Sequence, residues 1–560
     1  MKRMLALLLA AIMVLSMCSF AVAEEAPLVI DFYDDAANYH GIQTGWFAKV
    51  VKDRFNIELN IIAPQVAGEA IYATRAAEGN LGDILIMDKS KFVNCIEAGL
   101  VKDISDKLPE CENLMKYKLQ IDTYNQSLGK EEGVYLGIPA EMTDTSPVTK
   151  TDELVGSQPQ LRWDLYKEVG APEIKDLDGL LDVLAKIHEV HPTNEQGDPA
   201  YPFTLWPDWD NNDNMSGPAN VVQLTTWYGE KLKGAAILKP DNTFTKITDE
   251  TASYYKIAKF LNKANIMGIV DPESFEQDWN SVVSKISNGQ VDMIWYNWEI
   301  GFWNSAERLA DGSAFMFIPV EDMNYYCDAD SFYGSSRVWG VGSKVEGEKY
   351  DRIMEFLDWY ASPEGLVFQH DGLEGFNYVV NEDGTFTQIN DNALMDNLPV
   401  PEEFGGGGYQ DGNNAINQWL CASICTNPNT NETYDFKFWA SYIEQNNTPM
   451  KAEWAEKFGA ANAVEWMKKN GKLLASPSVT ANLVTDTNDI ELLRTDINNS
   501  LCKYTWQMIA AESEEDFDAL WTKMVTELEG LEYDKLYEYD CAKWQVEVDA
   551  KIAAAEAFAE

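Results

Sequence analysis

The stretch that decides the fold is "PLVIDFYDD" at residues 27–35, an apolar run that reads as a strand. Two similar runs follow it, "IELNIIAPQ" at 57–65 and "LGDILIMD" at 81–88. Between these runs, "TGWFAKVVKDRFN" and "GEAIYATRAAEGN" place apolar residues at helical spacing. Strands that alternate with helices predict a mostly parallel sheet covered by helices on both faces. The predicted fold class is therefore α/β.

The length and charge of the chain limit what it does. A single hydrophobic core stops growing at roughly 250–300 residues, so a chain of 560 residues is expected to form at least two domains. The net charge of −48 repels nucleic acid and anionic lipid, and we expect neither as a partner. Cys421 and Cys425 lie four residues apart, a spacing that favours a buried thiol pair or an optional disulfide over a metal site.

The first 23 residues indicate export. A basic start, "MKRM", precedes the apolar run 5–17 and then "AVA" at 21–23, which is the pattern of a secretory signal peptide cleaved after Ala23. The sequence "LSMC" also allows lipidation at Cys18. Both alternatives place the mature protein on the outer side of the cytoplasmic membrane, either secreted or held by a lipid anchor.

Two stretches combine large aromatic rings with polar side chains. Sugars present apolar C–H faces and hydroxyls, so a sugar site needs flat rings edged by carboxylates and amides. In "ISNGQVDMIWYNWEIGFWNSAERL" (286–309) the candidate ligand-binding residues are Trp295, Asn297, Trp298, Glu299 and Trp303. In "LWPDWDNND" (205–213) they are Trp206, Asp208 and Trp209. Because side chains alternate along a strand, we expect at least two residues of the first stretch to face the core instead.

Motifs for catalysis are poorly represented. "HEVH" at 188–191 has the wrong spacing for the H-E-x-x-H metalloprotease motif, and we find no G-x-S-x-G sequence. The four glycines 405–408 lack the Gly-Lys-Ser/Thr of a phosphate-binding loop and predict a flexible surface loop. We therefore expect no enzyme and no catalytic residues. The C-terminal part from Ile490 to Phe558 is predicted to be largely helical.

Several segments together resemble one protein family. They include "AAEGNLGDILIMD", "YLGIP", "LRWDLYKEVGAPEIKDLDGLLDVLAKIHEVHP", "ISNGQVDMIW" and "WGVGSKVEGEKYDRIMEFLDWYASPEGLVFQHDGLEGFNY". In order and spacing they resemble extracellular solute-binding proteins (family 1, carbohydrate-type) of ABC importers, close to the long lipoprotein-type and alginate-oligosaccharide-binding branch. "INDNALMDN" and the C-terminal part from "DIELLRTDINNS" also look like that branch.

The resemblance implies a periplasmic-binding-protein-like fold of two lobes joined by hinge strands, with a ligand cleft that closes between them. The N-terminal lobe is expected at 27–138 plus about 318–390, and the C-terminal lobe at 139–317 plus about 391–560. A monomer that docks on ABC permease subunits is implied, with membrane contact only through that docking or a lipid anchor. Outside the two aromatic stretches, the implied ligand-binding residues are Gln65, Asp88, Lys89, Glu141, Trp339, Asp371, Glu374 and Tyr378.

One departure from the family concerns calcium. Members of the branch often carry an Asp-rich calcium loop, and this chain has "HPTNEQGDPAYP" (191–202) at the corresponding place. Asn194, Gln196 and Asp198 still offer oxygens, but calcium prefers six to eight oxygens with several carboxylates. We therefore expect no cofactor, with these three residues as a weak calcium candidate and a tight turn at Asn194, Gly197 and Pro199 as the alternative.

The function implied is that of an exported receptor that captures a carbohydrate, an oligosaccharide in the first instance, and delivers it to a membrane permease. Two other hypotheses stay open. One is a secreted glycan-active enzyme with aromatic subsites, and the other is a receptor for a peptide or another polar solute. The sequence leaves open the length, linkage and charge of the ligand.

Overall fold

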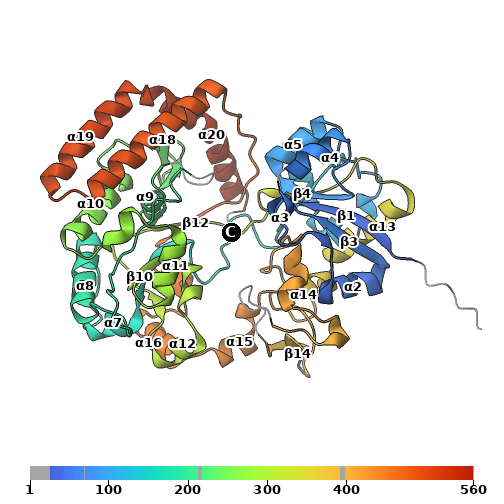
Figure 1. Cartoon of the computed structure of the whole chain (residues 1–560), viewed down its shortest axis with the longest axis horizontal. Coiled ribbons are helices and arrows are strands. Elements are labelled where there is room, and N and C mark those ends of the chain that lie inside the picture. Colours follow the sequence, from blue (N-terminus) through green and yellow to red (C-terminus); the bar gives the residue numbers. More distant parts are fainter. Residues whose placement is uncertain (1–25, 69, 212–216, 391–397, 559–560) are drawn as a thin grey trace, which may run out of the picture. The chain divides into compact units, whose positions relative to one another are not determined.

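The computed structural model describes residues 26–68, 70–211, 217–390 and 398–558, which form two compact units (Figure 1). The first unit takes the chain up to Met142 together with Gly334–Phe436, and the second takes Thr143–Tyr333 with Lys437–Glu560. The chain thus passes from one unit to the other after Met142, Tyr333 and Phe436, whereas the sequence places these passages near residues 138, 317 and 390. The predicted signal segment, with Cys18 and Ala23, lies outside the described residues.

A six-stranded sheet forms the centre of the first unit. Its strand order is β2-β3-β1-β4-β13-β5. The bounds are β1 (Leu28–Asp34), β2 (Gly41–Ile42), β3 (Ile57–Ile62), β4 (Ile84–Asp88), β5 (Ile138–Pro139) and β13 (Arg337–Val341). Strand β1 pairs in parallel with both β3 and β4, as the alternation of strands and helices predicts. The return strand β13 is antiparallel to β4 and pairs Arg337 with Asp88.

Alternate side chains of this sheet enter two separate cores. Ile30 and Phe32 of β1 face one core, while Tyr33 faces the other, because successive residues of a strand point to opposite faces. The first core is covered by α2 (Gly45–Phe55), α13 (Gly347–Tyr360) and α14 (Pro363–His370). The second is covered by α4 (Ala70–Ala77) and α5 (Lys89–Glu97), which Figure 1 shows on the other side of the sheet.

The segment 398–436 belongs to the first unit. The sequence instead predicts it to lie in the C-terminal lobe. The indole N–H of Trp46 donates to the carbonyl of Tyr409 (2.8 Å), and the Gln43 amide donates to that of Gly412 (2.8 Å). The four-glycine run is no free surface loop, which corrects the prediction. Gly405 has φ +119°, and a Cβ there would lie 2.9 Å from the Cα of Trp46. The glycines are therefore needed for close approach to α2.

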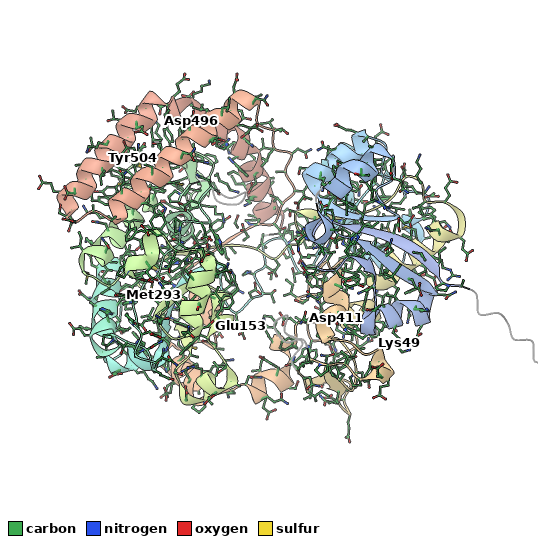
Figure 2. The ribbon with its side chains drawn as sticks, in the orientation of Figure 1. Lys49, Glu153, Met293, Asp411, Asp496 and Tyr504 are labelled. Atoms are coloured by element: carbon green, nitrogen blue, oxygen red, sulfur yellow. The ribbon has the colours of Figure 1, made fainter. Side chains whose placement is uncertain are left out.

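The second unit contains a small antiparallel sheet of β6 (Ser157–Arg162), β10 (Met293–Tyr296) and β11 (Phe315–Phe317), in the order β10-β6-β11. Around it lie α8 (Leu177–Val190), α10 (Ser253–Ile266) and α11 (Trp279–Ser287). Side chains of these elements share one continuous hydrophobic core. Met293 marks the start of β10 in Figure 2.

Three long helices complete the second unit, as predicted for the C-terminal part. They are α18 (Asn488–Ile509), α19 (Glu514–Gly530) and α20 (Tyr533–Ala557). Figure 1 shows α18 and α19 side by side, and Figure 2 marks Asp496 and Tyr504 on α18. The Arg494 guanidinium of α18 pairs with the buried Asp540 of α20 (2.7 Å), which also accepts the N–H of Ala235 (2.7 Å). This ion pair joins both helices to the body of the unit.

The described residues show neither a membrane-spanning helix nor a disulfide. Across these ranges, no helix is both long and apolar enough to span a bilayer. None of the seven cysteines in the described ranges forms a disulfide. Cys421 and Cys425 are both buried, and the Tyr117 hydroxyl donates to the Cys425 sulfur (3.7 Å).

Candidate functional site

Seven aromatic rings gather in the second unit, from three separate stretches of the chain. They are Trp206, Trp209, Trp279, Trp295, Tyr296, Trp298 and Phe302. Trp206 stacks on Trp295 with the ring centroids 5.2 Å apart and the planes 6° from parallel. Tyr296 stacks on Trp298 at 5.1 Å. The two aromatic stretches singled out in the sequence therefore meet in space, as a sugar site requires.

The seven rings form two layers. Trp206, Trp295 and Tyr296 are buried and make the inner layer. Trp209, Trp279 and Phe302 are half-buried, while Trp298 exposes 44% of its surface. We call these four outer rings the aromatic platform. The ring centroid of Trp279 lies 4.8 Å from that of Trp209 and 5.2 Å from that of Trp298, so the outer rings adjoin one another.

Polar side chains fix the segments that carry the platform. The Asp208 carboxylate accepts the backbone N–H of Trp279 (3.0 Å), which joins the loop after Leu205 to the first residue of α11. The neighbouring Asp210 carboxylate accepts the indole N–H of Trp506 on α18 (2.6 Å) and the N–H of Ala219 (2.8 Å). Asp208 and Asp210 thus tie the segments of the platform to one another and to α18, while Asp208 itself stays exposed, and its predicted contact with ligand stays a prediction.

Glu299 lies beneath the platform. Its carboxyl accepts the backbone N–H groups of Trp295 and Tyr296, both at 2.9 Å, and the side chain is 1% exposed. Burial raises the pKa of Glu299 to about 8, because the charged form loses its hydration. The prediction that Glu299 contacts ligand is corrected, because the carboxyl is enclosed by the protein.

Other predicted residues of the aromatic stretches also turn out to be internal. Trp206 and Trp295 support the platform from below. Trp303 lies apart from the seven rings, where its indole N–H donates to Ser313 (2.8 Å) and the Arg308 guanidinium covers its face at 3.6 Å. Trp303 is therefore a core residue, contrary to the prediction. Asn297 is half-buried on the turn next to Trp298.

Two members of the platform were not predicted. Trp279 opens α11, whose N-cap is Asp278, and its helix presents Val282 and Ile286 to the core. Phe302 follows Trp298 by four residues. Trp279 shares the i, i+3, i+7 face of α11 with Val282 and Ile286, so its spacing predicts a core ring and no local signal marks it as a surface residue.

In the first unit, four predicted residues follow the ends of sheet strands. Asp88 is exposed and accepts the Ser336 hydroxyl (3.2 Å), and Gln65 is exposed on the short helix after β3. The Lys89 ammonium donates to Ser127 (2.8 Å), and burial lowers its pKa. Glu141 has the left-handed backbone angle φ +55° and donates its N–H to Trp419 (3.0 Å). A role for these four in ligand binding stays a prediction.

The remaining predicted residues of the first unit are mostly buried. Trp339 is fully buried on β13 against Phe32 (5.7 Å between centroids), and Tyr378 stacks on Phe386 at 4.5 Å. Asp371 is 3% exposed, and burial with the nearby Asp435 charge raises its pKa well above the usual range. These three are core side chains, contrary to the predicted ligand contact. Glu374 is exposed.

The calcium candidate loop is closed by its own side chains. The Asn194 side-chain oxygen accepts the N–H groups of Gln196 (3.1 Å) and Asp198 (2.8 Å), and its amide donates to Asn288 (2.9 Å). Glu195 pairs with Arg308 (3.4 Å). Over the described parts of the chain, no three His, Cys, Asp or Glu side chains are grouped to hold a metal ion. The loop does not fit the six to eight oxygens of a calcium site.

Comparisons with solved structures show the fold. The alginate-binding protein AlgQ2 without calcium ion is 15% identical, with a TM-score of 0.55 over 93% of this chain and 98% of that chain. The S. pneumoniae ABC-transporter substrate binding protein FusA in complex with kestose is 14% identical, with a TM-score of 0.55 over 92% and 99%. An HMO-binding solute binding protein from Bifidobacterium longum infantis is 13% identical, with a TM-score of 0.58 over 94% and 100%.

These likenesses show a two-lobe fold of the periplasmic-binding-protein kind. None of the curated proteins matches the chain. Residues 40–367, more than half of the sequence, match the family described as bacterial extracellular solute-binding protein, which confirms the resemblance seen in the sequence. The chain belongs to the family of bacterial extracellular solute-binding proteins.

Proposed function

We propose that this protein is the exported substrate-binding component of an ABC importer, that it captures an oligosaccharide on the aromatic platform, and that it delivers this ligand to a membrane permease. The observation that carries the proposal is the outer ring layer of Trp209, Trp279, Trp298 and Phe302. Four adjoining aromatic rings that remain partly in water form the kind of contiguous apolar surface that marks an interaction site. The apolar faces of sugar rings match such a surface.

The family supports binding as the activity. Solute-binding proteins capture a ligand and do not transform it, and the carboxylates around the platform fit that role. Asp208, Asp210 and Glu299 all accept hydrogen bonds from backbone N–H groups. A glycosidase needs two carboxyls that face the same glycosidic bond. We therefore propose a receptor and no catalytic residues.

The comparisons favour carbohydrate as the ligand class. The similar structures include an alginate-binding protein, a complex with kestose and an HMO-binding protein. At this low identity they support only the proposal of a sugar, not the choice of one. Gln65, Asp88, Lys89, Glu141 and Glu374 stay candidates for polar contacts in the first unit.

A thermal-shift screen of residues 24–560 tests the proposal. The probes are neutral oligosaccharides, acidic oligosaccharides and short peptides, each at a fixed concentration. A ligand that binds only the native state stabilises it by about 2.7 kcal/mol at a hundredfold excess over Kd. A shift with one oligosaccharide class, with that glycan recovered intact, is expected. A shift with peptides alone would remove the sugar, and cleavage of the glycan would indicate an enzyme.

Export leaves two alternatives for the mature N-terminus. Cleavage after Ala23 releases a protein that starts at Glu24, whereas lipidation at Cys18 retains it on the membrane surface. We infer an extracellular location in both cases and a monomer as the working form. Intact mass spectrometry of protein from the native cell envelope distinguishes the two, because only the second carries an added diacylglycerol.

A further inference from the structure

Strand β10, which leads into the platform, pairs irregularly with its neighbour β6. Strand β10 pairs with β6 in antiparallel register at Ile294 and Gln160, and again at Tyr296 and Ser157. Between these pairs β6 advances three residues while β10 advances two, so β6 carries a bulge at Gln158 and Pro159 opposite Trp295. Proline has no N–H, and it is tolerated in a sheet at such bulges.

The bulge disturbs the hydrogen bonding at the end of β10. In a regular antiparallel ladder only alternate N–H groups of β10 face β6, so the bulge disturbs the acceptor of Tyr296. The N–H of Trp295 faces the other side of β10, as the N–H of Met293 does when it donates to Pro202 (3.1 Å). The carbonyl of Pro159 instead accepts the N–H of Ile318 on the other side of β6 (3.1 Å). The N–H groups of Trp295 and Tyr296 are in the buried core and still require acceptors.

Glu299 supplies these acceptors from within the same chain segment. Its Oε2 accepts both N–H groups at 2.9 Å. The side chain therefore reaches back three and four residues and closes a turn over 295–299. Trp298 is on this turn, and Glu299 itself begins the 3₁₀ helix Glu299–Phe302 that ends with the ring of Phe302. The buried carboxyl of Glu299 thus holds the turn that carries Trp298 and Phe302, two of the four rings of the platform.

We propose that Glu299 is a positioning residue of the ligand site, whose buried carboxyl takes the two N–H groups beside the β6 bulge and thereby fixes the turn that presents Trp298 and Phe302. It acts without touching ligand. The expected effect of Glu299 on ligand affinity rests on the proposed function. Its expected effect on the order of the turn does not depend on any ligand. The raised pKa of Glu299 agrees with this enclosed place, since Oε2 accepts both N–H groups whether or not the other oxygen is protonated.

The test compares three variants by hydrogen exchange and mass spectrometry of peptides covering residues 293–303. Glu299→Ala removes the acceptor, and exchange in this segment is expected to rise at least tenfold. Glu299→Gln keeps an oxygen acceptor and is expected to stay within about threefold of the wild type. Glu230→Ala is the matched control, because the buried Glu230 also accepts two hydrogen bonds in this unit, from the N–H and hydroxyl of Ser253. It should leave exchange at 293–303 unchanged.

The binding arm uses the oligosaccharide that gives the largest shift in the screen. Its affinity is expected to fall at least tenfold in Glu299→Ala, measured well below the melting temperature, and to return in Glu299→Gln. Unchanged exchange in Glu299→Ala, or a Gln variant as impaired as the Ala variant, overturns the proposal. If no oligosaccharide binds the wild type, the proposed function fails while the exchange arm still decides the role of Glu299. Glu299→Met replaces the Ala variant should that one not fold.

Discussion

At the scale of single residues, Trp298 distinguishes a binding surface from a core. Its neighbours Trp295 and Tyr296 are buried in the inner ring layer, yet Trp298 leaves 44% of its surface in water. A ring this exposed gains less from burial than the rings beneath it, because stabilisation grows with the apolar area removed from water. Trp298 is therefore the ring of the cluster with the most apolar area free to meet a ligand, as the proposed function requires.

Trp298→Ala is expected to weaken oligosaccharide binding more than tenfold, and to lower the melting temperature less than truncation of the fully buried Trp295. Truncation of a central aromatic contact typically costs more than 1 kcal/mol in binding, and 1.4 kcal/mol is a factor of ten. Isothermal titration calorimetry gives the affinity. Leu492→Ala is the control, because Leu492 is 67% exposed on α18, away from the seven rings. Equal affinities in the two variants would exclude Trp298 from the site.

The buried carboxyls predict how stability depends on pH. Burial raises the pKa of Asp34 and that of Glu299 to about 8, from 3.8 and 4.5. Between the ordinary and the raised values the folded protein holds protons that the unfolded chain has lost, so the free energy of unfolding falls as pH rises. The melting temperature is therefore expected to decrease between pH 5.5 and 8.5. A smaller decrease in Glu299→Gln, measured by scanning calorimetry, assigns part of the slope to Glu299. A parallel slope in the variant would contradict that assignment.

At the scale of elements, the loop 191–202 is held by the side chain of Asn194. Asn194 is 6% exposed and makes three hydrogen bonds that hold the turn, while Gln196 and Asp198 remain in solvent. The side-chain oxygen of Asn194 accepts two N–H groups of the loop, and its amide N–H donates outside the loop to Asn288. The loop is thus a structural connection between α8 and the core.

Asn194→Ala is expected to lower the stability of the second unit by about 1–3 kcal/mol, since the three hydrogen bonds of the buried Asn194 side chain are lost. Asp198→Ala is the comparison, because its side chain is exposed, and it should change stability little. Thermal melts with calcium and with EDTA should coincide in the wild type. A melting temperature that drops in EDTA would show that the loop holds a cation after all.

At the scale of the whole molecule, the chain builds its cores in two separate units. The second unit has one continuous core, made by residues that lie between positions 155 and 536 of the chain. The first unit has two cores, one on each face of its sheet. Units with their own cores unfold as units, so a single two-state transition is not expected for the full chain.

Calorimetry is expected to show two transitions that respond to different mutations. Gly412→Ala should lower only the transition of the first unit, because a Cβ there would lie 1.9 Å from the indole nitrogen of Trp46. Asn194→Ala should lower only the other. Gly530→Ala is the control, since a Cβ at this helix end meets nothing within 4 Å. If both transitions move together in either variant, the units unfold as one.

The sequence was informative where local pattern and side-chain chemistry agree. The β-α-β-α-β start, the C-terminal helices and the loops with Trp209 and Trp298 were all predicted from spacing and composition. Trp279 was missed, because its helix begins 70 residues after Trp209 and only the folded core brings the two rings together. Trp339 and Asp371 were expected as ligand contacts from the family resemblance, yet both are buried, Trp339 in a core shared with α13.

The sequence by itself determined the family, the α/β character and the aromatic chemistry, because periodicity and composition are local properties of the chain. Only the tertiary structure decided which rings face solvent and which acids face the interior. Exposure depends on contacts between residues far apart in sequence, such as Trp206 with Trp295 and Asp210 with Trp506. The same holds for Glu299, whose role follows from a bulge in a strand about 140 residues earlier and from the proline that lies in it.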